Sequence, residues 1–130
     1  MILRQLFFDR PTLTVARELL GKFLVRKWRG KIITAMITEV EAYDGSEDKA
    51  SHASRGMTTR NKPMFGPSGV WYVYLVYGMH EMLNVVTGPV GYPAAILICG
   101  VELINPNIWK SDFQILGDGP GKVTRALHIG

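Results

Sequence analysis

Residues 31–42 read KIITAMITEVEA, a pattern typical of a long β-strand. The first half is rich in β-branched residues, which pack well on a pleated surface. Because side chains alternate along a strand, every second residue is predicted to share one face: Ile33, Ala35, Ile37, Glu39 and Glu41. An apolar face that ends in two carboxylates is unusual, since burying a charge is costly. Either the carboxylates belong to a site, or the strand twists out into solvent there.

Further strand patterns lie on both sides of this stretch. A strand is predicted over Lys22–Trp28, followed by a turn at Arg29-Gly30-Lys31. Later in the chain we expect three more strands, over Val70–Tyr77, Met82–Thr87 and Ala94–Ile104.

An amphipathic helix is predicted before the first strand, over Thr12–Leu20. Thr12 or Thr14 is expected to cap its start, and Gly21 to take the left-handed conformation after its end. The predicted buried stripe consists of Leu13, Ala16, Leu19 and Leu20.

Two segments outside these elements carry polar residues of interest. Residues 43–68 form a predicted long loop that contains His52 and Arg60, and such long loops are uncommon unless they have a function. Further on, Gly117–Lys122 is a glycine-rich entry to a predicted helical piece at Lys122–Leu127. Backbone N–H groups at such a helix start bind phosphate well, and a plain loop-to-helix transition is the alternative.

The composition fits one packed domain of 130 residues. The formal net charge of +4 favours a polyanionic partner such as nucleic acid, but a merely basic protein has the same balance. Cys99 is the single cysteine, so no internal disulfide forms, and its apolar surroundings predict a small buried residue. The histidines lack the spacing of a zinc site, and no stretch is apolar enough for a membrane span. We expect no metal, no cofactor, no membrane association and a reducing cytoplasm.

Glu41 is the strongest candidate for a catalytic group. A partly desolvated carboxylate at the end of an apolar strand can act as a general base on water. Together with Glu39 it also suggests the two-carboxylate chemistry of glycoside hydrolysis. Neighbours on one strand face are too fixed in spacing to bracket a sugar, so we favour one working carboxylate.

The aromatic strand holds a second candidate. Tyr72 and Tyr74 are predicted to share one face, and Trp71 and Tyr72 to be core residues. Tyr77 differs, because it precedes Gly78 at a predicted hairpin tip. A bulky side chain at such a tip can wedge between base pairs.

Taken in order, these segments resemble the alkyladenine (3-methyladenine) DNA glycosylase family over nearly the whole chain. The similar stretches are Leu19–Gly21 with Leu24-Val25, Glu39–Tyr43, Asp48–His52, Thr59–Asn61 with Met64-Phe65, Tyr72–Met79, Asn84 and Gly119–Lys122. Each stretch is weak alone, and their order carries the resemblance. It implies DNA repair by hydrolysis of the bond between a damaged purine and its sugar.

The resemblance assigns pocket roles to five residues. Glu41 corresponds to the family's general base. Tyr43, His52 and Tyr74 correspond to the walls that contact the extruded base, and Asn84 to the residue that hinders the amino group of normal guanine. An extruded, electron-poor purine gains stacking energy on such aromatic walls.

The resemblance also implies a DNA-binding surface. Tyr77 corresponds to the side chain that fills the gap in the duplex, with Met79 in the same segment, and Arg60 and Lys122 lie in segments that meet the DNA backbone. The expected partner is double-stranded DNA containing damaged purines, bound by a monomer in the cytoplasm beside a bacterial nucleoid, or in a nucleus. Plain hydrolysis without strand cleavage is expected, since no lysine stands out as a Schiff-base nucleophile.

The implied fold is α+β, a single domain over residues 1–130 around a curved antiparallel β-sheet with a projecting β-hairpin near Tyr77, like the barrel of formyltransferase C-terminal domains. Two departures from the family stand out. Cys99 occupies the place of an arginine near the catalytic glutamate, and cysteine cannot supply that charge or its donors. The family also continues past the segment that matches Val123–Leu127, so part of the pocket wall and a closing strand are expected to be missing.

Two other functions stay open on the sequence. A non-catalytic domain that binds damaged bases is compatible with Cys99 and with the early C-terminal end. A carboxylate-based hydrolase of ribosides or small glycosides is disfavoured by the wedge at Tyr77 and by the basic charge, since a small substrate needs neither.

Overall fold

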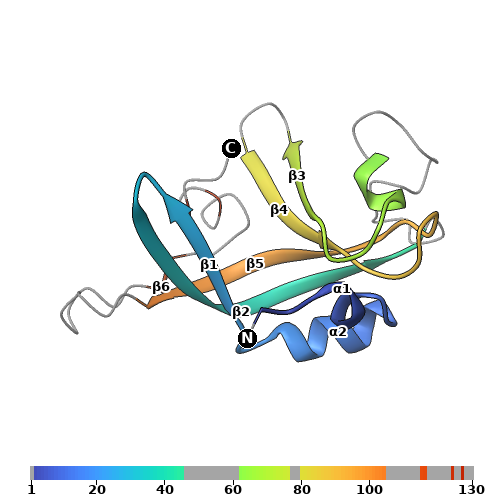
Figure 1. Ribbon diagram of the computed structural model, residues 1–130, viewed down its shortest axis with the longest axis horizontal. Helices are drawn as coiled ribbons and strands as arrows, with labels where there is room; N and C mark the ends of the chain where they lie inside the picture. Colours follow the sequence, from blue (N-terminus) through green and yellow to red (C-terminus); the bar gives the residue numbers. More distant parts are fainter. Residues whose placement is uncertain are drawn as a thin grey trace.

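The computed structural model describes residues 2–45, 62–76 and 80–104, together with residues 115, 116, 124 and 127. The described part is a curled antiparallel sheet with short helices packed against it (Figure 1). The strands are β1 (Phe23–Trp28), β2 (Lys31–Asp44), β3 (Trp71–Val76), β4 (His80–Val86), β5 (Ala94–Ile104) and β6 (Ile115–Leu116). Their order is β1-β2-β5-β4-β3, and β6 pairs with β5. The predicted α+β class and the curved antiparallel sheet are confirmed.

Helices lie on both sides of this sheet. α1 (Gln5–Phe8) and α2 (Thr12–Leu19) lie beneath β2 and β5 in Figure 1, whereas η1 (Lys62–Phe65), a 3-10 helix, lies above them. The two sides are called here the helix face, covered by α1 and α2, and the η1 face.

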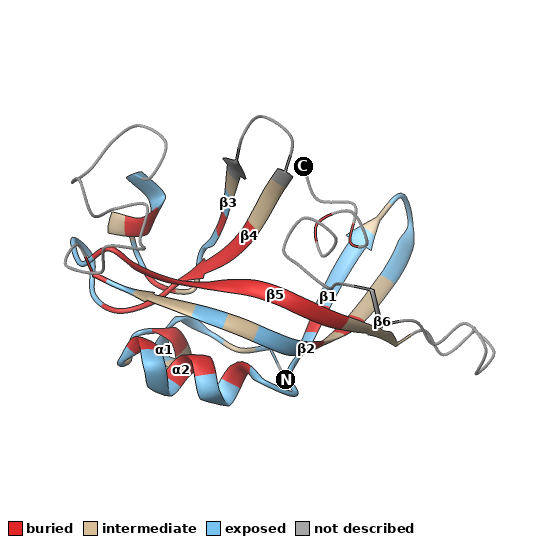
Figure 2. Ribbon diagram, turned by 180° about the vertical axis from the view of Figure 1, so that it is seen from behind, coloured by how far each residue is buried: buried red, intermediate tan, exposed pale blue. Residues whose placement is uncertain are grey.

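Each face has its own hydrophobic cluster. The larger cluster lies on the helix face, where Val15, Ala16 and Leu19 of α2 meet inward side chains of β2, β4 and β5. The smaller cluster lies on the η1 face and contains Met64, Tyr72, Val86 and Ala95. β5 contributes to both clusters and is buried along most of its length (Figure 2). Burial on both faces explains why the sequence of β5 is a nearly continuous apolar run.

A β-bulge in β2 overturns the predicted side-chain alternation. The pairing with β5 runs Ile37↔Val101, Glu39↔Gly100 and Val40↔Ile98, so Thr38 in β2, and then Cys99 in β5, have no directly opposing residue. An extra residue of this kind reverses the faces of all residues that follow it. Before the bulge, Ala35 and Ile37 face the larger cluster, and after it Val40 and Ala42 do. Glu39 and Glu41 therefore do not share a face with Ile37, as predicted, but lie on the η1 face.

Helix α2 has the predicted position but a different buried stripe. Its buried residues are Thr12, Val15, Ala16 and Leu19, whereas Leu13 and Leu20 are 57% and 48% exposed. The predicted stripe favoured leucines, but the buried positions follow the i, i+3, i+4, i+7 spacing from Thr12. Burial of Thr12 is tolerated because its hydroxyl lies 3.0 Å from that of Thr87. Pro11 occupies the N-cap position and no side chain caps the helix, so the predicted threonine cap is wrong.

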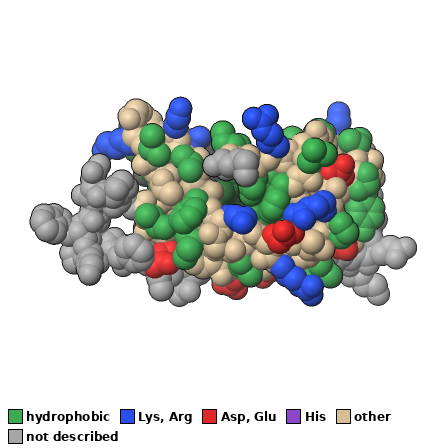
Figure 3. Space-filling model, turned by 60° about the horizontal axis from the view of Figure 1, so that its bottom comes forward, with side chains coloured by type: hydrophobic (Ala, Val, Ile, Leu, Met, Phe, Trp, Pro, Cys, Tyr) green, Lys and Arg blue, Asp and Glu red, His purple; other side chains and the backbone are tan. Residues whose placement is uncertain are grey.

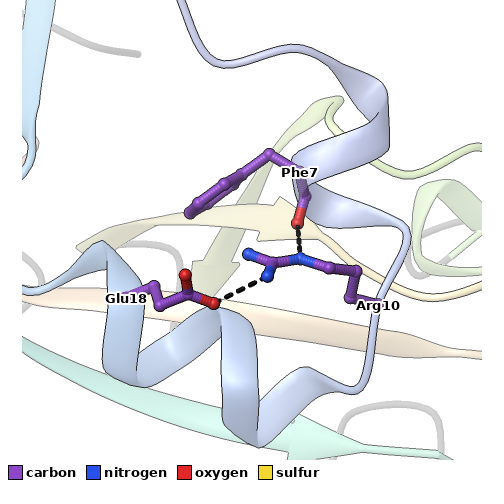
Figure 4. A network of polar contacts seen from close by, with 3 residues as sticks. All are labelled: Phe7, Arg10 and Glu18. Carbon is purple, nitrogen blue, oxygen red and sulfur yellow. Dashed lines mark hydrogen bonds and ion pairs between the residues drawn. The ribbon is translucent and has the colours of Figure 1, made fainter.

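Both charge signs are mixed on the outer surface of these helices (Figure 3). Arg4, Asp9, Arg17 and Glu18 are all exposed there. Arg10 joins the two helices: its Nη1 lies 2.7 Å from Glu18 Oε2, and its Nε donates to the carbonyl of Phe7 at 2.8 Å (Figure 4).

Most predicted strand bounds are close to those observed. β5 has the predicted bounds, and the turn after β1 is confirmed by positive φ angles at Arg29 and Gly30. β2 extends to Asp44, two residues beyond the prediction. Tyr72 is buried as expected, whereas Trp71 is 49% exposed, so its core assignment is wrong. β3 and β4 form the predicted hairpin, whose tip lies outside the described residues.

The bulge makes a prediction for stability. Val40→Ala should lower the free energy of unfolding by about 1 kcal/mol or more, because it removes methyl groups that contact the larger cluster. Glu39→Ala, one residue away on the other face, should change it by less than about 0.5 kcal/mol. Urea unfolding of the two variants measures both values. A larger loss of stability for Glu39→Ala than for Val40→Ala would contradict the bulge and support the regular alternation expected from the sequence.

Candidate active site

Four of the predicted site residues come together on the η1 face. Glu41 pairs with Leu97, Leu97 with Asn84, and Asn84 with Tyr72, so one row of directly opposed residues crosses β2, β5, β4 and β3. With strands about 4.8 Å apart, Glu41 and Asn84 are separated by roughly 10 Å across Leu97.

Tyr43 and Tyr74 flank this row. Tyr43 opposes Ala95 in the next row of the same face. Tyr74 lies two residues after Tyr72 on β3 and shares its face, and the two rings make an edge-to-face contact with centroids 5.8 Å apart. The predicted shared face of these two tyrosines is confirmed. His52, Arg60, Tyr77, Met79 and Lys122 lie outside the described residues.

The Glu41 carboxylate is held by Tyr43. The Tyr43 phenol donates a hydrogen bond to Glu41 Oε2 at 2.7 Å. Residues two apart on a strand share a face, which brings the phenol within reach. Glu41 is exposed, not partly desolvated as predicted, because the bulge turns it away from the larger cluster. Its orientation therefore comes from a hydrogen bond rather than from burial.

Asn84 is a rigid part of this face. It is 3% exposed. Its Nδ2 donates to the backbone carbonyls of Met82 at 3.1 Å and of Tyr72 at 3.3 Å. A buried amide that is bound to two backbone acceptors has little freedom to rotate. Asn84 can therefore act as a fixed steric block beside Leu97.

Cys99 lies beside the carboxylates as a neutral thiol. It is 4% exposed, and its Sγ lies 3.7 Å from the carbonyl of Leu97. Burial, and then the negative charges of Glu41 and Glu39, raise the pKa of the Cys99 thiol to about 12. The predicted small buried cysteine is confirmed. At position 99 the chain thus has a neutral thiol next to Glu41.

Sequence reasoning missed the contribution of Leu97 and the bond between Tyr43 and Glu41. Leu97 lies in a continuous apolar run, and only the strand pairing shows which face it takes. The Tyr43 bond was missed because the predicted strand ended at Ala42, which left Tyr43 in the following loop, whereas β2 continues to Asp44.

A separate cleft of about 430 Å³ opens at the end of β2 near the start of α2. Its lining includes Arg10, Thr12, Asp44 and Tyr92, and none of the predicted site residues. Asp44 Oδ1 accepts hydrogen bonds from Tyr92 at 2.7 Å and from Thr12 at 3.3 Å. These bonds anchor the end of β2 just beyond Glu41 and Tyr43.

Comparison with known proteins gives this face its context. Residues 6–130 match the family model of methylpurine-DNA glycosylase. The chain belongs to the methylpurine-DNA glycosylase family. The family resemblance recognised in the sequence is thereby confirmed.

Several curated relatives of this glycosylase family share the name "Putative 3-methyladenine DNA glycosylase". The chain is 49% identical to the one from Methanocella arvoryzae, over 95% of this chain and 65% of the relative. It is 43% identical to the one from Alkaliphilus oremlandii, over 99% and 71%, and 45% identical to the one from Sodalis glossinidius, over 98% and 69%. The chain thus spans about two thirds of the length of these glycosylase relatives.

Within the family site, Cys99 is expected to be chemically inert. The thiolate is the reactive form, so an aromatic disulfide reagent at pH 8 should label the native protein far more slowly than the urea-unfolded chain. Below a pKa of about 12, native labelling should accelerate about tenfold per pH unit. Absorbance of the released thiol measures the rate, and Cys99→Ser gives the background. Equal rates in native and unfolded protein would contradict the buried, neutral thiol.

Proposed function

We propose that this chain is a DNA repair glycosylase that hydrolyses the bond between a damaged purine and its deoxyribose, with Glu41 as general base. One observation carries the proposal: the carboxylate of Glu41 is oriented by Tyr43 on the same face as Tyr74 and Asn84. Family membership supplies the reaction class, and this face supplies the chemical groups that the reaction needs.

The proposed reaction begins with extrusion of the damaged nucleotide, because its glycosidic bond is hidden inside the base stack. The extruded base would lie on the η1 face between aromatic side chains. Stacking on each ring recovers about 1–3 kcal/mol. Tyr43 and Tyr74 supply aromatic surface on either side of the row from Glu41 to Asn84.

Hydrolysis then requires one water and one base. Glu41 accepts a proton from the water, whose oxygen forms a bond to C1′ of the sugar. The C1′–N bond breaks, and its electron pair leaves with the purine. An alkylated purine that carries a positive charge leaves as a neutral base, so the departure is easy. The products are the free base and an abasic site, and no amine nucleophile is needed.

Tyr43 has a positioning role in this scheme. Its phenol occupies Oε2 of Glu41, so Oε1 becomes the oxygen that can receive the proton. A single defined acceptor favours a single water position, which lowers the cost of reaching the transition state.

A second candidate function is binding of damaged bases without hydrolysis, and Cys99 is the observation that favours it. A neutral, buried thiol beside Glu41 supplies no charge to hold the water or to stabilise its deprotonation. In that case the aromatic face would still receive an extruded base.

We also propose that the curled sheet is part of a formyltransferase C-terminal-domain-like barrel. The β1–β2 and β3–β4 hairpins both rise on one side of β5 (Figure 1), as expected for a sheet that curls toward a barrel.

Substitution of the base tests the proposed function. Glu41→Gln should slow single-turnover release of free base from alkylated DNA by roughly 10²–10⁴-fold, because it removes the proton acceptor. DNA affinity should stay within a few-fold. Glu39→Gln is the matched control, since it neutralises the exposed carboxylate next on the same face and should retain the rate. Absence of release by the unaltered chain, with retained affinity for damaged DNA, would favour the binding function.

Tyr43→Phe separates positioning from stacking. The variant keeps the ring and loses the hydrogen bond to a charged group, which contributes about 1.5–3 kcal/mol. We expect base release to slow roughly 10-fold or more, with unchanged affinity for damaged DNA. In the Glu41→Gln background the same change should have no further effect on the rate. Additive losses in the double variant would show that the phenol does not act through Glu41.

A further inference from the structure

The β1–β2 hairpin is a strongly basic part of the molecule. Of the 15 Lys and Arg residues in the chain, its strands, turn and entry carry Lys22, Arg26, Lys27, Arg29 and Lys31. All of these cations are exposed. No Asp or Glu occurs between Leu19 and Thr38. The surface of α1 and α2 differs, because charges of both signs are mixed there (Figure 3).

The turn of this hairpin holds a cation at its tip. Arg29 and Gly30 have φ angles of 47° and 77°, the left-handed pair that suits a two-residue hairpin turn. The Arg29 guanidinium lies 4.8 Å from the Trp28 ring centroid, a cation–π contact that orders the side chain. Lys27, Arg29 and Lys31 form no ion pair with a carboxylate in the described ranges. Their charge is therefore directed to solvent.

The hairpin is connected to the candidate active site by one continuous strand. Lys31 begins β2, and Glu41 lies near its other end. At about 3.3 Å per residue, the two are at most roughly 33 Å apart, and one turn of B-DNA spans about 34–36 Å. The β1–β2 and β3–β4 hairpins rise on the same side of β5, away from α1 and α2 (Figure 1).

We propose that the β1–β2 hairpin is a second DNA contact, which binds backbone phosphates up to about one helical turn from the damaged nucleotide. The inference rests on the proposed function for the identity of the polyanion. A basic surface without carboxylates attracts phosphates through release of their counterions, and this attraction does not depend on base sequence. The hairpin adds affinity and orientation along the duplex, while the chemistry stays at Glu41.

Salt-dependent binding to duplexes of two lengths tests this contact. The long duplex carries one alkylated purine with about 15 base pairs on each side, and the short duplex has about 5, which is less than the reach of the hairpin. The test variant is Lys27→Gln with Arg29→Gln. The matched control is Arg4→Gln with Arg17→Gln, which removes the same charge from the surface of α1 and α2. Fluorescence anisotropy gives the dissociation constant from 0.05 to 0.3 M salt.

The hairpin variant should lose about one to two units of the log–log salt slope on the long duplex, since each phosphate contact contributes about 0.9. On the short duplex it should bind as the unaltered protein does. The control should keep its slope on both. Base release at saturating DNA should be unchanged in both variants, because neither alters the face that carries Glu41.

Three results would overturn the proposal: an unchanged slope on the long duplex, an equal loss on both duplexes, or an equal loss in the control. Failure of the proposed function looks different. If the unaltered chain releases no base but the hairpin variant still loses salt slope on the long duplex, the DNA contact is supported and the proposed glycosylase activity is wrong. If base is released and the slope is unchanged, only the hairpin contact is wrong.

Discussion

The pairing of β2 with β5, and the bulge within it, is the constraint on which the site depends. Up to Ile37 the strand directs its apolar side chains to the helix face, and from Val40 onward it does so again in the opposite phase. The change of phase occurs where Thr38 in β2 and Cys99 in β5 lack opposing residues. Without this change of phase, a carboxylate at position 41 would face the larger hydrophobic cluster, between α2 and the sheet. A local irregularity in the pairing of two strands thus places the acidic group on the face that carries Tyr74 and Asn84.

Much of the fold followed from pattern alone. Alternating residues in β2, the continuous apolar run of β5 and turn residues such as Gly30 located β1, β2 and β5 almost to the residue. The bulge was not predictable from periodicity, since a one-residue insertion leaves the composition of the strand unchanged. The stripe of α2 was misassigned for a related reason. Hydrophobicity favoured Leu13, but tertiary hydrogen bonding buries Thr12 in its place.

The site was predicted in part. The resemblance identified Glu41, Tyr43, Tyr74 and Asn84, and strand pairing brings these four residues to one face. The polar bond between Tyr43 and Glu41 required coordinates, because it depends on a shared face that the predicted alternation did not assign to Tyr43. The exposure of Glu41 was also missed. We expected Glu41 to be desolvated because apolar residues precede it, but the bulge places Glu41 on the opposite face from those residues.

The two-sided burial of β5 bears on how such a protein can change during evolution. Ile96 and Ile98 pack on the helix face, whereas Ala95 belongs to the cluster on the η1 face, and Leu97 lies on that face too. Substitutions at Ala95 and Leu97 would alter the η1 face and leave the packing against the helices in place. A lineage can therefore vary the side chains of the η1 face without rebuilding the core beneath β5.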